Sequence, residues 1–425
     1  MIEVVNKSGK VRSADQRVIR ELVCEIVARV CRQQWDHRLR SLLLTGSVAR
    51  DETTILAHPS GWRVLGDADF MAVFQRHAPL PAAGVVAALT AKCESDLRAA
   101  GVFAHVGLAV VHDDYFCRLP AHIFTYELRC CGRMVCGDGN PLGLIPRFPA
   151  SAIDTEDAWR LLANRTIECL ELSANSLHAP TSPSPKPGEA QGTAPNGSLA
   201  VAPEELHYRA VKLFLDMATS LLVFLGAYEP TYGQRAQSLQ QLAERREGQA
   251  ALPFGLKVFA GRVNECTRWK ISGGGGDCNS GVEISRQALD YACQLWRWEL
   301  AQLTSAAPEA SPEILFARVA ARQSALQKLR GWLYVVRRTG WLRGVRSWPR
   351  WMAMGPRCTP RYYIYEAARR LAASATGSPS EPEMRQISAL LPVAGGAAKN
   401  DGDARQQLAR EVAWNYRTFL TETRA

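Results

Sequence analysis

Two short polar motifs, each joined to an apolar run, constrain the fold of this chain more than any other feature. The first is Gly46 followed by Ser47, which comes after the apolar residues 42–44. The second is Asp67 with Asp69, which comes directly before the apolar residues 70–74. Short apolar runs bounded by turn-forming residues are typical of buried strands. The sequence therefore predicts two core strands, with a glycine-serine turn ending one and two carboxylates on the other.

These residue types suit the binding of a nucleoside triphosphate with its Mg²⁺. Side chains at positions i and i+2 of a strand point to the same face, so Asp67 and Asp69 converge, and carboxylate oxygens are good Mg²⁺ ligands. Gly46 carries no side chain, which lets a phosphate approach the backbone. Ser47 adds a hydroxyl where the next helix is expected to begin, and helix N-termini bind anions. Arg50, one turn further on, is within reach of the same phosphates.

The segment 42–74 resembles the catalytic core of the polymerase-beta-like nucleotidyltransferase superfamily. The matching positions are Gly46, Ser47, Arg50, Asp67 and Asp69. The resemblance implies an α+β nucleotidyltransferase core, a small mixed sheet flanked by helices, followed by an all-α helical C-terminal region. It also implies Mg²⁺-dependent transfer of a nucleoside monophosphate from a nucleoside triphosphate to an acceptor. Residues 55–65 lengthen the spacing between the two motifs, and we expect them to form an inserted surface loop.

One departure from the family pattern concerns a third carboxylate, which relatives carry on a later strand. The matching predicted strand, residues 105–111, contains no Asp or Glu. The alternatives are Asp113 and Asp114 just beyond it and Glu127 on the next predicted strand, while His105 is a candidate base. The sequence therefore predicts nucleotide binding more firmly than turnover. The alternative function is a catalytically degenerate, nucleotidyltransferase-like binding or regulatory module that acts at a membrane surface or on nucleic acid.

Periodicity and turn residues divide the chain into four regions. We expect a catalytic core over residues 1–150, a connecting helix over 151–177, a flexible linker rich in Pro, Ser and Gly over 178–203, and a helical domain over 204–425. The predicted strands are residues 40–45, 66–74, 105–111, 123–129 and 133–136. The predicted helices are residues 13–35, 81–100, 154–177, 203–225, 234–246, 282–304, 312–336, 360–373 and 404–421. Residues 266–277 are predicted to be a loop.

Two features of the helical domain are candidates for contacts with the substrate. The helix containing Lys212 resembles the family helix that supplies a phosphate-contacting lysine, and the alternative is a surface ion pair between Lys212 and Asp216 at helical spacing. Residues 228–235 form a polar-aromatic loop that either contacts the base or acceptor or connects two helices by packing its tyrosines.

A basic segment, residues 328–351, combines Lys and Arg with four tryptophans and contains no acidic residue. This composition suits an anionic membrane surface or stacking on single-stranded nucleic acid. The alternative is an ordinary helical surface with buried tryptophans and solvated arginines. The net charge of +10 favours acidic partners in either case.

Composition places the chain among ordinary globular proteins. The 425 residues are 47% hydrophobic and 22% charged. The first twelve residues lack the apolar core of a secretory signal, and no run is long and apolar enough to predict a membrane span. Twelve cysteines without a Cys-x-x-Cys motif are expected to be free thiols. We therefore expect a cytoplasmic protein, alone or peripherally bound to a membrane. The acceptor, whether antibiotic, RNA, protein side chain or sugar, stays open.

Overall fold

The computed structural model describes residues 13–176, 203–245, 252–273, 281–307, 309–340, 347–374, 379–395 and 403–420. The predicted linker, apart from Pro203, lies outside these residues. Contacts divide the chain into two compact units. The first comprises Met1–Ala158, Leu222–Gln249 and Leu256–Gly276, and the second comprises Trp159–Leu221, Ala250–Gly255 and Asp277–Ala425. This division runs through the predicted helical domain.

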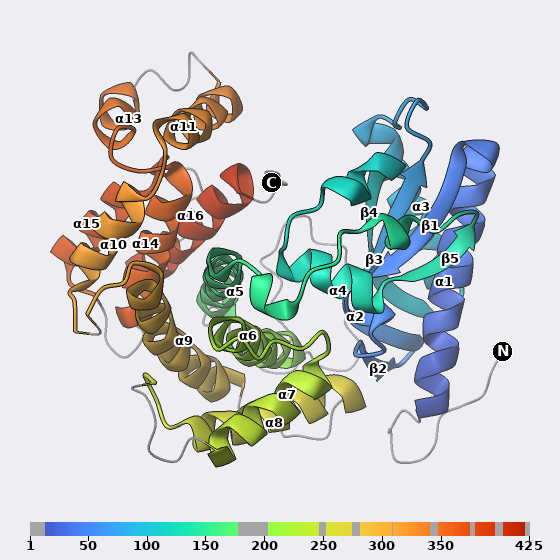
Figure 1. The fold of residues 1–425 in the computed structure, drawn as a ribbon, viewed down its shortest axis with the longest axis horizontal. Helices are drawn as coiled ribbons and strands as arrows, with labels where there is room; N and C mark the ends of the chain where they lie inside the picture. Colours follow the sequence, from blue (N-terminus) through green and yellow to red (C-terminus); the bar gives the residue numbers. More distant parts are fainter. Residues whose placement is uncertain are drawn as a thin grey trace, which may run out of the picture. The chain divides into compact units, whose positions relative to one another are not determined.

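The first unit is built on a five-stranded mixed sheet (Figure 1). Its strands are β1 (Leu39–Thr45), β2 (Thr54–His58), β3 (Gly61–Phe74), β4 (Val102–His112) and β5 (Arg133–Gly137). The long strand β3 organises the sheet, because it pairs antiparallel with β1 and β2 and parallel with β4. β5 pairs antiparallel with β1. The α+β fold class predicted from the sequence is confirmed at this level.

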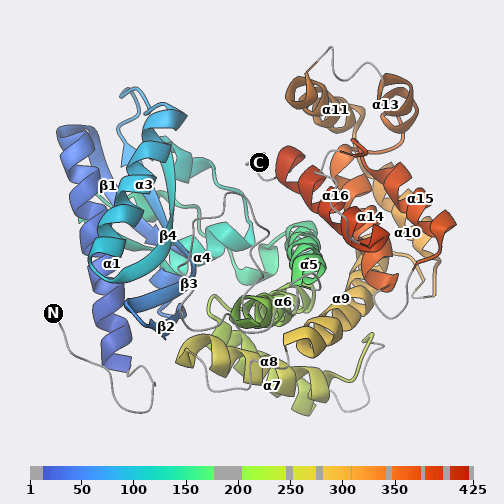
Figure 2. The ribbon, with the colours of Figure 1, turned by 180° about the vertical axis from the view of Figure 1, so that it is seen from behind.

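The two faces of the sheet bury separate sets of apolar side chains. Helices α1 (Ser13–Trp35) and α3 (Ala83–Ala99) cover one face, which is in front in Figure 2. Their apolar residues pack there against Leu42, Leu44 and Phe70. The opposite face buries Leu43 and Met71, together with residues that include Leu128 of α4. Because successive strand residues alternate between faces, β1 and β3 each contribute to both clusters.

Most predicted elements of this unit are confirmed, but three predictions are wrong. Residues 123–129 form helix α4 (Ile123–Cys131) instead of a strand. Residues 55–65 form a hairpin of β2 and β3 instead of a loop, because their backbone groups pair across the turn. Residues 266–272 are the last part of helix α8 (Leu256–Ser272) instead of a loop.

Helices α7 (Tyr232–Arg245) and α8 complete the first unit. The Thr54 hydroxyl of β2 donates a 2.9 Å hydrogen bond to the carbonyl oxygen of Lys270 on α8. The backbone N–H of Gly233, in the first turn of α7, donates to Glu52 Oε1 at 3.0 Å. Both contacts bring segments from the second half of the sequence to the end of the sheet that carries the glycine-serine turn.

All regular elements described in the second unit are helices. They are most of α5 (Thr155–Ser176) and α6 (Pro203–Phe224), then α9 (Gly281–Leu303), α10 (Pro312–Ala321), α11 (Ala325–Thr339), α13 (Trp348–Met354), α14 (Pro360–Ala373), α15 (Glu381–Leu390) and α16 (Ala404–Phe419). The helix predicted over residues 312–336 is broken between α10 and α11, where the Ser324 side chain caps α11. Among the described residues, no helix combines the length and apolar character needed to cross a membrane.

Candidate functional site

The register of β3 places Asp67 and Asp69 at the end of the sheet. Asp69 pairs with Thr45 of β1 and with Gly107 of β4, and Asp67 pairs with His105 of β4. Both aspartates share the face of β3 that buries Met71 further along the strand. Along that face of β3, the apolar cluster includes Val73 and Met71, and the two carboxylates follow Met71 toward the start of the strand. Asp67 is exposed and Asp69 is partly buried.

Two glycines leave the space that the Asp69 carboxylate occupies. A Cβ atom at Gly46 would lie 2.8 Å from Asp69 Oδ2, and one at Gly107 would lie 2.4 Å from Asp69 Oδ1. Gly46 also has a φ of +67°, a conformation that residues with a side chain rarely adopt. The predicted phosphate turn and the predicted metal ligand are thus in direct contact. Gly107 was missed by sequence reasoning, although a glycine inside an apolar strand is a signal of close backbone approach.

The turn itself is short. After Gly46 the chain makes a single helical turn, α2 (Gly46–Ala49), so the expected longer helix is not formed. The Thr53 hydroxyl donates to Ser47 Oγ at 3.2 Å, which fixes the serine side chain. Within the described part of the chain, the Asp67 carboxylate has neither an ion-pair nor a hydrogen-bond partner. Its oxygens are therefore open to a ligand from solvent.

The two aspartates fit Mg²⁺ that is bound together with a phosphate ligand. Mg²⁺ is usually held by one or two carboxylates, with waters and substrate phosphates filling the other positions. Asp67 and Asp69 supply two carboxylates on one face of one strand. Among the described residues, no group of three or more His, Cys, Asp or Glu side chains is placed to hold a metal ion. A cation at these two carboxylates would need its remaining ligands from water or from another molecule.

Arg50 lies in a buried ionic network behind the turn. Its side chain is only 5% exposed, and its Nε donates to Glu52 Oε2 at 3.1 Å. Its Nη1 is ion-paired with Glu127 of α4, and its guanidinium lies 5.0 Å from the ring centre of Tyr232. Arg50 therefore supports the turn from behind through these contacts. The second carboxylate oxygen of Glu52 holds the start of α7, as described above.

Glu127 is the centre of this network. It also accepts hydrogen bonds from Arg235 and, at 2.8 Å, from the Tyr228 hydroxyl. Burial alone would raise the pKa of this carboxyl, but the guanidiniums of Arg50 and Arg235 outweigh it and hold the pKa below its ordinary value. Glu127 is thus a charged structural anchor. Of the two predictions for residues 228–235, the structure supports tyrosine packing, since Tyr228 and Tyr232 are buried in the network.

The other candidates for a third carboxylate also have partners away from Asp67 and Asp69. Asp113 is ion-paired with Arg40, and Asp114 is paired with Arg118 at 2.7 Å. His105, the strand neighbour of Asp67, has a side chain that is 83% exposed and whose Nδ1 lies 3.4 Å from Glu94 Oε1. The positions beside the aspartates on β4 are therefore a histidine and a glycine.

Lys212 belongs to the second unit, on α6. Its pKa is lowered by burial and by the nearby Arg165, while Asp216 and Glu168 oppose the shift. Asp216 is buried and accepts a 2.6 Å hydrogen bond from Arg165 Nε. The predicted surface ion pair between Lys212 and Asp216 is wrong, because Asp216 is not on the surface and pairs with Arg165.

Comparison with protein-family models, with curated proteins and with solved structures found no match. The resemblance to nucleotidyltransferases therefore rests on the motif residues of the sequence alone.

Proposed function

We propose that this chain binds a nucleoside triphosphate with Mg²⁺ at Asp67 and Asp69, and that it is a nucleotidyltransferase of the polymerase-beta-like superfamily. The observation that carries the proposal is the contact of the Asp69 carboxylate with Gly46. It joins a carboxylate suited to Mg²⁺ to a turn suited to phosphates within one rigid piece of sheet. Such a juxtaposition is what a metal–triphosphate complex requires.

Each residue of the site has a role in this proposal. Asp67 and Asp69 would hold the cation, which would supply positive charge to the phosphate oxygens. Gly46 and Ser47 present backbone N–H groups and a hydroxyl to the phosphates. Arg50 acts from behind by fixing the turn through Glu127 and Glu52. Catalysis of this kind consists mainly of positioning and charge stabilisation, which these residues supply without covalent chemistry.

Nucleotide binding is tested by equilibrium dialysis with radiolabelled nucleoside triphosphates, with Mg²⁺ or with EDTA. The double variant Asp67→Asn, Asp69→Asn is expected to bind at least about tenfold more weakly than the unchanged chain with Mg²⁺, a loss of about 1.4 kcal/mol or more. The control is Asp36→Asn, which alters a carboxylate that is 88% exposed and that lies before β1, outside the candidate site. Equal affinity in the double variant and the unchanged chain would contradict the proposal.

A second candidate is a nucleotide-binding module without turnover. It is favoured by one observation, that His105 and Gly107 occupy the β4 positions beside the two aspartates. Incubation of the protein with α-labelled nucleotides, Mg²⁺ and cell extract separates the two candidates. Covalent label on any acceptor that is lost in the double variant supports the transferase. Tight binding with no transfer to any acceptor class supports the binding module.

A further inference from the structure

One segment of the second unit carries a large excess of basic over acidic residues. Residues 314–365 contain eleven Lys or Arg residues and no Asp or Glu. The net charge of the whole chain is +10, so this segment accounts for all of it. It comprises α11 and α13 with parts of their neighbours α10 and α14. Residues 341–346 lie outside the described residues.

Two of the described tryptophans of this segment, Trp332 and Trp351, are buried and offer no stacking surface. Trp332 is 7% exposed and donates its indole N–H to the carbonyl oxygen of Cys358 at 2.9 Å. Trp351 is 6% exposed and donates to the carbonyl oxygen of Pro392 at 2.7 Å. The two rings pack against each other with centroids 6.3 Å apart. Because single-stranded nucleic acids bind by stacking bases on exposed aromatic rings, this arrangement disfavours that partner.

The solvent face of α11 is apolar as well as basic. Leu326, Leu329 and Leu333 are 53%, 56% and 56% exposed, and their spacing of three and seven residues places them on one side of the helix. Arg330 and Arg337 are exposed on the same side. The opposite side of α11 is the one that packs into the unit, through Trp332 and Val335. The leucines are thus not needed for the core.

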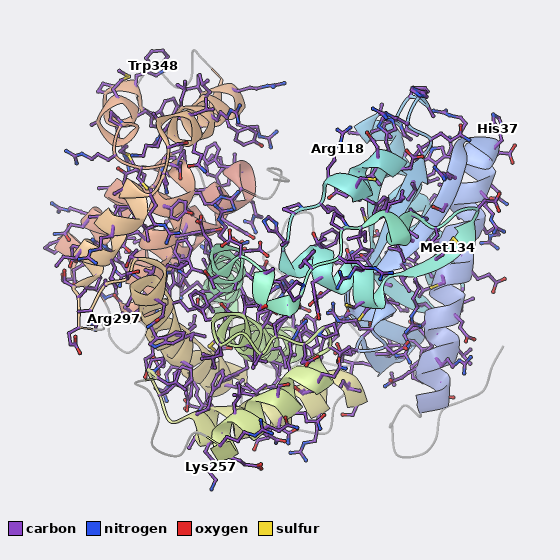
Figure 3. The ribbon with its side chains drawn as sticks, viewed as in Figure 1. His37, Arg118, Met134, Lys257, Arg297 and Trp348 are labelled. Carbon is purple, nitrogen blue, oxygen red and sulfur yellow. The ribbon has the colours of Figure 1, made fainter. Side chains whose placement is uncertain are left out.

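Helix α13, which lies beside α11, carries another exposed apolar side chain. Met352, on α13, is 71% exposed. Both ribbon views show α11 and α13 next to each other at one end of the helical unit (Figures 1 and 2). Figure 3 places Trp348 of α13 at the same end. Exposing several leucines on one side of a helix to water is unfavourable. Apolar patches on a protein surface often mark interaction sites.

We propose that this face of α11 and α13 docks onto a membrane surface that contains anionic lipids. The leucines would enter the boundary between headgroups and acyl chains, while Arg330 and Arg337 would contact lipid phosphates. A nucleic-acid backbone would satisfy the arginines but would leave the leucines in water. The proposal goes beyond nucleotide binding and does not depend on it, since all its residues lie in the second unit.

The test is co-sedimentation of the full chain with phosphatidylcholine vesicles, with and without phosphatidylglycerol. We expect sedimentation with the anionic vesicles only, weakened by salt. The triple variant Leu326→Ser, Leu329→Ser, Leu333→Ser should bind at least tenfold more weakly. The double variant Arg330→Gln, Arg337→Gln should lose about fivefold for each charge, the equivalent of about 1 kcal/mol per arginine. Circular dichroism checks that each variant keeps its helix content.

The matched control removes one exposed basic side chain and one exposed aliphatic side chain in the first unit. Lys257→Gln with Val258→Ser removes an exposed charge and a valine that is 69% exposed on α8, and it should leave vesicle binding unchanged. The proposal is overturned by absence of binding to anionic vesicles, or by equal binding of the triple variant and the unchanged chain. It is also overturned if a single-stranded RNA oligonucleotide binds through Arg330 and Arg337 while vesicles do not.

Discussion

Two glutamates, Glu127 in the first unit and Glu299 in the second, are in opposite electrostatic environments. Glu127 in the first unit contacts two guanidiniums and a tyrosine hydroxyl, and its pKa is lowered. Glu299, on α9 in the second unit, is fully buried and has no ion-pair partner among the described residues, and the nearby Ser220 hydroxyl only weakly favours its charged form. Burial raises the pKa of Glu299 to about 8. The first carboxyl is therefore charged in the folded protein, and the second is neutral at physiological pH.

This difference separates two uses of a glutamate carboxyl. A charged carboxylate can hold arginine side chains in position by ion pairing, but the carboxylate and the guanidiniums all lose hydration free energy. Glu127 does so behind the Gly46 turn, where the candidate site needs a rigid backbone. A neutral carboxyl forms no ion pair. Because its pKa differs between the folded and unfolded states, it makes the free energy of unfolding depend on pH. Variants of Glu299 therefore test the pH-dependent stability of the helical unit, and variants of Glu127 test the ionic network behind the candidate site.

The largest effect is expected from Glu127→Ala. It would leave the guanidiniums of Arg50 and Arg235 buried without their shared counter-ion, which costs about 3–5 kcal/mol in free energy of unfolding. Urea denaturation measures this loss. The control Glu21→Ala removes a surface ion pair with Arg17 and should change the midpoint little. A loss in Glu127→Ala no larger than in the control would show that the network is not structural.

The next effect concerns pH and Glu299. In the unfolded chain this carboxyl loses its proton near its ordinary pKa of 4.5, but in the folded chain only near pH 8. Between these values the folded state holds a proton that the unfolded state has lost, so the contribution of Glu299 to stability falls as pH rises.

Glu299→Gln cannot titrate, so its stability relative to the unchanged chain should rise between pH 4.5 and 8 and level off above that range. The expected change is roughly 3–5 kcal/mol, at 1.36 kcal/mol for each pKa unit. Thermal denaturation of both proteins across this range measures it. A constant difference between them at all pH values would mean that the carboxyl is already charged in the folded chain.

A smaller and more local effect is expected from Gly46→Ala. The new Cβ would require a φ of +67° and would press on Asp69 Oδ2, so we expect a loss of about 2 kcal/mol in stability and weaker nucleotide binding. Gly226→Ala is the matched control, because Gly226 has a φ of +66° and no atom within 4 Å of its new Cβ. Both variants should lose stability, but only Gly46→Ala should lose nucleotide affinity.

The sequence predicted the parts of the candidate site that depend on local pattern. The apolar runs before Gly46 and after Asp69 predicted the two strands, and the spacing of Asp67 and Asp69 predicted their shared face. The pairing of Asp69 with Gly107 could not be predicted in this way. It depends on the register of β3 against β4, which is set by contacts over the whole length of both strands.

The helix α4 shows where local preference fails. Residues 123–126 are rich in β-branched and aromatic side chains, which favour a strand when judged alone. They form a helix that buries Ile123, Thr125 and Leu128, and Leu128 joins the second apolar cluster. The same helix carries Glu127 to its two arginines. Arg235 lies more than one hundred residues away in the sequence, so no local pattern links the two.

The central claim is that Asp67 and Asp69 hold the cation of a metal–triphosphate complex. The most direct measurement is a crystal structure with Mn²⁺ in place of Mg²⁺ and a nucleotide whose α,β-bridging oxygen is replaced by methylene. Anomalous scattering then locates the metal. We expect one metal peak within coordination distance of both carboxylates, with triphosphate oxygens against Gly46 and Ser47. A triphosphate bound elsewhere, or a metal that contacts neither aspartate, would contradict it.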